Sequence, residues 1–402
     1  MQQELEKIEI KESKIPHLLK YMGSKREILD FVIEAIESLE VKSSWLCDLF
    51  SGTGVVGGVL KDKYSIHAND VQAYSAILSS TYLSNLKGKI SQDCLYEIKE
   101  RVDILVADFY NRIPNYRFDY SKIESFDEFN LIELEQQKLI DKDFKIGFHL
   151  FTKNYSGTYW SFEQCVWIDS IRAVAERYVG KPQYYPILSS LIFSMSYASQ
   201  STGHYAQYRD ATEDNMLDIM SYRKREIWPY FERKFIELIE NVNGLSMDFR
   251  VTTLDYVDCL RVIEENSIVY ADPPYQSVHY SRFYHALETL VRYDYPKVDF
   301  KGRYRQDRHQ SPFCKKTTVN SAFELLFEGV AQKNSHLVLS YSDTGMIDLN
   351  TILALSTKSL PSYETTVLEK NHVHSKMGRS DEKSQDVKEF IILFKKVTNA
   401  ST

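Results

Sequence analysis

The chain has 402 residues, of which 43% are hydrophobic and 26% charged, and its formal net charge at pH 7 is −7. This composition excludes a disordered protein. The chain is long enough for one large domain with an insertion or for two domains. The acidic balance argues mildly against a protein that binds nucleic acid over its whole surface, although local basic patches decide such contacts.

The cysteines lie far apart and none forms a CxxC pair: Cys47, Cys94, Cys165, Cys259 and Cys314. We therefore expect a reducing, cytoplasmic location and no zinc site. The ten histidines show no metal-ligand spacing either, so we assign no metal. The charged N-terminus and the lack of an apolar run of membrane length predict neither a signal peptide nor a membrane span.

The first motif is a glycine before a helix start. Ser24 and Glu27 have the spacing of a capping box, and apolar residues from Ile28 onward follow at helical spacing. A helix is therefore predicted to begin just after Gly23. The glycine permits a ligand to approach the backbone closely, and Lys25 in the first turn can reach a carboxylate.

The second motif is a strand, a glycine turn and a helix. Residues 45–50 form an apolar strand, residues 51–54 (SGTG) form the turn, and apolar residues follow. This arrangement lets a nucleoside lie across the carboxyl edge of a parallel sheet. The loop matches neither the GxGxxG fingerprint nor a Walker loop, so phosphate binding is disfavoured. The next strand ends at Asp70, where an acid can take both ribose hydroxyls.

Polar and basic groups gather at two places in the middle of the chain. Residues 200–205 form a polar loop with groups able to read base edges, among them His204. Residues 221–234 carry five cations, including Arg223 and Lys224, on a predicted helix. This helix can face phosphates, although a solvated helix face explains the charges as well.

The stretch 268–275 (IVYADPPY) predicts a buried strand that runs into an acid and two prolines. The strand must stop there because neither proline can donate a backbone hydrogen bond, and Pro273 holds Asp272 in extended geometry. The Asp272 carboxylate and the Pro273 carbonyl then form a rigid acceptor pair. Two acceptors on an aromatic amine draw its nitrogen towards tetrahedral geometry and release its lone pair for attack. Tyr275 could stack on the base, while an ordinary Pro-Pro turn is the alternative.

Three motifs, in this order, resemble those of Dam-type (alpha-group) N6-adenine DNA methyltransferases: residues 20–25 (KYMGSK), 48–54 (DLFSGTG) and 272–275 (DPPY). The resemblance covers the first part of the chain and residues 245–396, and it is thin between them. It implies an α/β fold with a Rossmann-like methyltransferase sheet built from residues 1–85 and 245–402. Residues 86–244 would form an inserted, largely helical target-recognition domain.

The resemblance also implies roles for individual residues. Asp255 would accept from the amino group of the donor's adenine, and Tyr256 would pack on its ring. Asn154 and Tyr155 would lie near the target base, unless their segment is a core-lining turn. The catalytic set would be Asp272, Pro273, Pro274 and Tyr275. The residues that would bind S-adenosylmethionine are Tyr21, Gly23, Lys25, Asp48, Phe50, Ser51, Gly52, Gly54, Asp70, Asp255 and Tyr256.

The predicted activity is methyl transfer from S-adenosylmethionine to N6 of a flipped-out adenine in double-stranded DNA. Two alternatives stay open. The acceptor could be another planar amine, such as RNA adenine, N4 of DNA cytosine or a glutamine amide, or the chain could be a catalytically idle DNA-binding subunit. A restriction nuclease that acts separately is a further partner that the resemblance allows.

A basic stretch follows the catalytic motif, with Asp307 as its only counter-charge along the chain. Gly302 and Pro312 argue against a long helix, so we expect an exposed loop beside the catalytic pocket that is mobile without DNA. Contact with phosphates is our prediction, and base reading is the alternative. The cations are Lys301, Arg303, Arg305, Arg308, Lys315 and Lys316.

Overall fold

The computed structural model describes residues 15–19, 28–201, 203–243, 247–275, 277, 279–375 and 384–397, with backbone alone for 372–375 and 384–387. The predicted helix start and the predicted site residues Tyr21, Gly23 and Lys25 lie outside the described residues.

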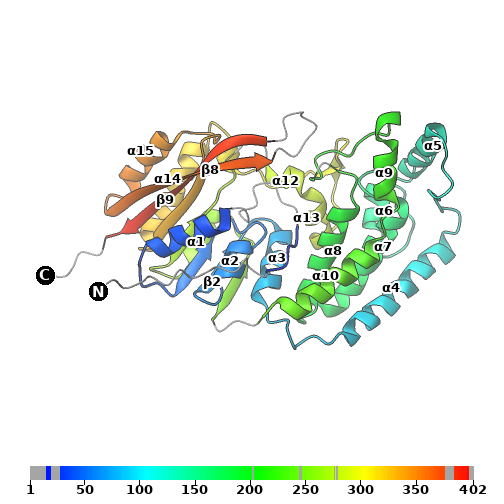
Figure 1. Cartoon of the computed structure of the whole chain (residues 1–402), viewed down its shortest axis with the longest axis horizontal. Helices are drawn as coiled ribbons and strands as arrows, with labels where there is room; N and C mark the ends of the chain where they lie inside the picture. Colours follow the sequence, from blue (N-terminus) through cyan, green and yellow to red (C-terminus); the bar gives the residue numbers. More distant parts are fainter. Residues whose placement is uncertain are drawn as a thin grey trace, which may run out of the picture.

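A seven-stranded sheet forms one half of the described structure (Figure 1). Its strand order is β3-β2-β1-β4-β7-β9-β8, in which the first five strands pair in parallel and β9 pairs antiparallel with both β7 and β8. This confirms the predicted α/β fold with a mostly parallel sheet. The strands are β1 Trp45–Asp48, β2 Ser65–Asn69, β3 Phe249–Thr252, β4 Ile268–Ala271, β7 His336–Ser342, β8 Tyr363–Ser375 and β9 Ser384–Lys396.

Helices cover both faces of this sheet because successive side chains of a strand point to opposite sides. The face with Cys47, Val269 and Leu337 packs against α11 (Tyr256–Val262), α14 (Val319–Gln332) and α15 (Leu349–Ser359). The face with Leu46 and Val338 packs against α1 (Leu29–Ser38) and α2 (Val55–Leu60). The central strands are therefore buried on both sides, as their continuous apolar sequences predict.

A group of helices lies beside the sheet (Figure 1). These helices are α3 Ala73–Leu83, α4 Asp93–Arg112, α5 Phe126–Gln137, α6 Leu150–Tyr155, α7 Phe162–Ala175, α8 Tyr184–Ala198, α9 Met216–Arg223 and α10 Ile227–Asn241. After β4 the chain adds α12 (Tyr280–Phe283), α13 (His285–Arg292) and a hairpin of β5 (Val298–Asp299) and β6 (Tyr304–Arg305). One hydrophobic core joins α3 and α13 to α7, α8 and α10. Since α3 and α13 lie outside residues 86–244, the domain division remains a prediction.

Candidate functional site

A cavity lies at the edge of the sheet where the parallel strands β1, β2 and β4 end. We call it the edge pocket. Most of its polar wall comes from residues directly after strand ends, where loops leave side chains projecting past the sheet. Its lining includes Asp48, Phe50, Ser51, Gly52, Asn69, Asp70, Gln72, Asp255, Tyr256, Asp272, Pro273, Pro274, Tyr275, His279, Tyr280, Ser281, His309 and Ser311.

The glycine turn after β1 forms one wall of the edge pocket. Its backbone is tied to the end of β2, because the N–H of Ser51 donates to the carbonyl of Asn69 at 2.8 Å. Gly54 precedes α2 with φ of +75°, and a Cβ there would lie 2.6 Å from Ser79 Oγ and 2.8 Å from Ser79 Cα. Both the positive φ and the contact with α3 require glycine at this position. Gly54 shapes the wall without lining it.

Asp70 is held in place by this turn. The N–H groups of Gly52 and Gln72 each donate to one of its carboxylate oxygens at 2.9 Å. Burial raises the pKa of Asp70, and these two hydrogen bonds oppose that rise. The structure therefore brings together Gly52 and Asp70 as predicted, and the binding of ribose by Asp70 remains a prediction.

Asp48 is a nearly inaccessible carboxylate at the base of the edge pocket, with 2% of its surface exposed. Burial raises its pKa to about 7, the backbone of Gly57 opposes this, and the negative charges of Asp272 and Asp70 add to the rise. Its Oδ2 has no hydrogen-bond partner among the described residues. Because burial opposes the ionisation of Asp48, a cationic ligand beside it would stabilise its charged form.

The acceptor motif lies at the end of β4. Strand β4 ends at Ala271, where the sequence predicts, and residues 272–275 line the edge pocket. Asp272 is half-buried and Pro273 is buried. The Tyr275 ring packs edge-on against Tyr341 with centroids 5.8 Å apart, and its hydroxyl bonds to Glu389. Tyr275 is thus fixed with 5% of its surface exposed, and its stacking on a base remains a prediction.

Aromatic rings beside the glycine turn contribute to the edge pocket. The rings of Phe50 and Tyr256 stack at 5.9 Å, and Phe313 packs edge-on against Tyr256 at 5.1 Å. Asp255 caps α11 by accepting from the N–H of Val257 at 3.0 Å. The sequence predicted an acid and an aromatic residue here, and the structure places both in the edge pocket.

Several residues that line the edge pocket were not predicted from the sequence. Asn69 donates to the carbonyls of Leu49 and Leu254 at 3.2 and 3.1 Å, so it ties two pocket loops together. Its position beside Asp70 was the only signal. His279 and His309 come from segments after β4, and no short motif marks them. The Nδ1 atom of His279 is buried without a hydrogen-bond partner in the described part of the chain.

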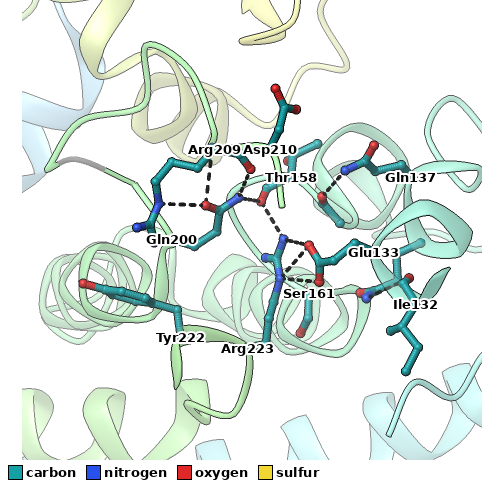
Figure 2. A network of polar contacts seen from close by, with 12 residues as sticks. Ile132, Glu133, Gln137, Thr158, Ser161, Gln200, Arg209, Asp210, Tyr222 and Arg223 are labelled. Carbon is teal, nitrogen blue, oxygen red and sulfur yellow. Dashed lines mark hydrogen bonds and ion pairs between the residues drawn. The ribbon is translucent and has the colours of Figure 1, made fainter. Parts of the chain in front are cut away.

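The predicted contact between Arg223 and DNA is wrong. Its side chain is fully buried and pairs with Glu133 at 2.6 Å, and it also donates to the Thr158 carbonyl at 2.9 Å. Figure 2 shows this network, in which Gln200 donates to the same carbonyl. Arg223 is therefore occupied inside the helical region and cannot reach a phosphate. Its neighbour Lys224 is exposed.

The other predicted DNA contacts are mostly enclosed as well. Tyr155 is fully buried and Asn154 is 4% exposed, and both belong to helix α6, which a buried turn at residues 157–159 follows. The ring of His204 packs against Phe283 at 4.6 Å and is half-buried. Neither Asn154 nor Tyr155 lines the edge pocket, and their roles near a target base remain a prediction.

The basic stretch also differs from its prediction. Arg305 is 1% exposed and pairs with Asp294 at 2.6 Å and Asp307 at 3.0 Å. Lys301 pairs with Asp210, and Arg303 pairs with Asp141. The expectation that Asp307 is the only counter-charge, and that the whole stretch is an exposed loop, is wrong. Among the described residues no ion pair involves Arg308, Lys315 or Lys316, and the predicted mobility remains untested.

The chain is similar to known proteins over the region that carries the motifs. A family model described as D12 class N6 adenine-specific DNA methyltransferase matches residues 21–353. This span includes the glycine turn, the helical region and strand β4, which ends just before Asp272. Among the described residues, no helix combines the length and apolar character that crossing a membrane requires.

Three bacterial relatives are similar over most of the chain. Modification methylase LlaI of Lactococcus lactis subsp. lactis is 25% identical over 94% of this chain and 55% of its own length. Type II methyltransferase M.FokI of Planomicrobium okeanokoites is 28% identical over 82% of this chain and 45% of its own. For M.NlaIII of Neisseria lactamica the values are 22%, 83% and 86%. The chain thus spans about half the length of the first two relatives.

Proposed function

Because the chain belongs to the D12 class N6 adenine-specific DNA methyltransferase family, we propose that it transfers a methyl group from S-adenosylmethionine to N6 of adenine in double-stranded DNA. One observation carries this proposal. The acceptor motif at the end of β4 and the acidic residues Asp48, Asp70 and Asp255 line one cavity, so an amine and a cationic donor can meet there.

The residues of the edge pocket fit the methyl donor chemically. S-adenosylmethionine carries a sulfonium and an ammonium group, and its sulfonium supplies the methyl group. Asp48 Oδ2, which has no hydrogen-bond partner within the described ranges, fits one of these positive charges. Asp70 would hold the ribose, Asp255 the adenine amino group, and the stacked rings of Phe50 and Tyr256 its aromatic face.

Asp272 and Pro273 would act on the target base. The Asp272 carboxylate and the Pro273 carbonyl would accept the two hydrogens of the adenine amino group. This contact is strongest when the nitrogen becomes tetrahedral, so it stabilises the transition state more than the bound base. The base must leave the duplex to enter the edge pocket, which requires base flipping.

The helical region would read the DNA. We propose that residues 86–244 supply the target-recognition domain and act with the segment after β4. Burial lowers the pKa of His279 in the edge pocket, and the positive charges of Arg308 and Lys315 in this segment lower it further. Because relatives are named modification methylases, we also propose that methylation protects cytoplasmic DNA against a separate nuclease. Challenge of DNA from an expressing host with restriction nucleases tests this role.

A transfer assay tests the proposed function. The purified chain would be incubated with radiolabelled S-adenosylmethionine and with duplex DNA, RNA or protein, and the labelled product digested to nucleosides. We expect label in N6-methyladenine from duplex DNA and none from RNA or protein. Label in cytosine, RNA or protein would support another planar amine as acceptor. Donor and DNA binding without transfer to any substrate would support an idle DNA-binding subunit.

A further inference from the structure

Three potential metal ligands meet beneath the edge pocket. Cys47 comes from β1, His67 from β2 and Cys259 from α11, and their sulfur and nitrogen atoms all lie within 4.8 Å of one another. Cys47 and His67 are register partners in adjacent parallel strands, so their side chains leave the same face of the sheet. Helix α11 covers that face and brings Cys259 to them.

The three side chains form an enclosed cluster. Their exposed fractions are 1% for Cys47, 2% for His67 and 0% for Cys259. The expectation of no metal site depended on spacing along the chain, which cannot detect ligands from three separate elements. A buried cysteine alone behaves as a small apolar residue, but two cysteines around an imidazole nitrogen offer a soft ligand set.

The spacing of the cluster fits a tetrahedral ion. Cys259 Sγ lies 3.9 Å from His67 Nε2. Zinc bonds of about 2.3 Å to sulfur and about 2.0–2.1 Å to nitrogen place these two ligand atoms roughly 3.6 Å apart in a tetrahedron. We propose that Cys47, His67 and Cys259 bind a zinc ion that braces the sheet under the edge pocket. This inference is independent of the proposed methyl transfer.

Hydrogen bonding around His67 defines the proton changes that binding requires. The side-chain oxygen of Asn69 accepts from the Thr252 hydroxyl at 2.7 Å, because its amide nitrogen already donates to two carbonyls. The Thr252 oxygen must therefore accept from His67 Nε2–H at 2.9 Å. Zinc binding at Nε2 would shift this proton to Nδ1, displace the Thr252 hydroxyl from Nε2 and release the remaining thiol protons.

The cluster places two cysteine sulfurs around one imidazole nitrogen, and cysteine binds metals as the thiolate. The site is also joined to the edge pocket, because Asp48 follows Cys47 and Asp255 begins the helix that carries Cys259. Occupancy would therefore stiffen two loops that line the edge pocket.

Metal content and stability test the proposal. The full chain, purified with a non-thiol reductant and stripped of metal, would be given one equivalent of Zn²⁺ and desalted. We expect about one bound ion per chain and a rise in Tm of about 3 °C or more in excess zinc. The Cys47→Ser/Cys259→Ser variant should lose both effects. Cys165→Ser, which removes an equally buried cysteine of α7, should keep both.

Cobalt spectroscopy tests the ligands without a variant. Co²⁺ added to the wild-type chain should give a thiolate-to-cobalt charge-transfer band and visible bands of tetrahedral cobalt, which Zn²⁺ should abolish. This readout decides the matter even if the double variant fails to fold. The proposal would be overturned by equal zinc content in the wild type and a folded double variant. It would also be overturned by a cobalt protein without these bands, or by a Cys47–Cys259 disulfide that persists in the reductant.

Discussion

The edge pocket and the two cation-rich segments, residues 221–234 and 301–316, are organised by contacts of different range. In the edge pocket, Asp70 is fixed by Gln72 two positions away and by Gly52 eighteen positions away. In the cation-rich segments, Arg223 pairs with Glu133 across 90 positions and Arg303 with Asp141 across 162. A local motif thus predicts where an acid points, whereas only the tertiary fold decides whether a cation is available to DNA.

The largest effect on stability is expected at Arg223, whose side chain is fully buried in its ion pair. Arg223→Ala should lower the free energy of unfolding by about 3–5 kcal/mol, because it leaves the buried Glu133 carboxylate without its partner. Urea denaturation measures the loss. Lys224→Ala, at the next, exposed position, should change stability by less than about 0.5 kcal/mol. A stable Arg223→Ala protein that binds DNA weakly would restore the DNA role that the structure removes.

Asp272→Ala tests the edge pocket at its proposed reacting group. Methyl transfer should fall on the order of 10²-fold or more, the effect of deleting one preorganised polar group, while donor binding is largely kept. Single-turnover rates and calorimetry separate the two quantities. Asp343→Ala is the matched control, since this acid follows β7, the neighbouring strand, and is exposed. Turnover near that of the wild type would remove Asp272 from the chemistry.

Sequence alone predicted the core of the sheet and much of the edge pocket. The strand from 268 to 271 matches β4, and the glycine turn and Asp70 lie together as expected. These predictions succeed because strand ends and turns are encoded within a few residues. His279 and His309 escaped because they come from separate loops. The cluster of Cys47 with His67 and Cys259 depends on strand register and helix docking, which no local pattern encodes.

Asp70→Ala should weaken donor binding by about 1.5–3 kcal/mol, the scale of hydrogen bonds to a charged group. The substitution also frees the N–H groups of Gly52 and Gln72, so the turn loses its internal acceptor. Calorimetry with S-adenosylmethionine measures the change. Asp62→Ala, an exposed acid after α2, should leave affinity unchanged. Equal affinities for wild type and Asp70→Ala would place the ribose elsewhere.

Cations of the basic stretch with and without a described ion pair should contribute differently to DNA binding. Arg308→Gln with Lys315→Gln removes two cations for which no ion pair is described, and should lower the salt slope of DNA binding by roughly two. Over a fourfold rise in salt concentration, the variant should therefore lose about tenfold less DNA affinity than the wild type loses. Lys301→Gln with Arg303→Gln should change the slope less, because Asp210 and Asp141 already neutralise them. Fluorescence anisotropy on random duplexes measures both slopes, and equal slopes would contradict the division.

The smallest effect concerns the titration of Asp48. Its folded pKa of about 7 lies above the ordinary aspartate value, so the folded state keeps a proton that the unfolded state loses between about pH 4 and 7. Folding stability from this group therefore falls as pH rises through that window and levels off above it.

Asp48→Asn removes this titration. Burial also raises the pKa of Asp70 and Glu288, but both acids are present in the wild type and in the variant, so their effects cancel in the comparison. The stability of wild type relative to the variant should decline by on the order of 1 kcal/mol from pH 5 to pH 7, as relaxation around a buried charge limits the effect. Urea midpoints at several pH values measure this difference. A cationic donor beside Asp48 would stabilise the ionised form, so saturating S-adenosylmethionine should flatten the decline. Parallel stability curves without donor would show that Asp48 is ionised throughout, and its charge would then be compensated by the protein itself.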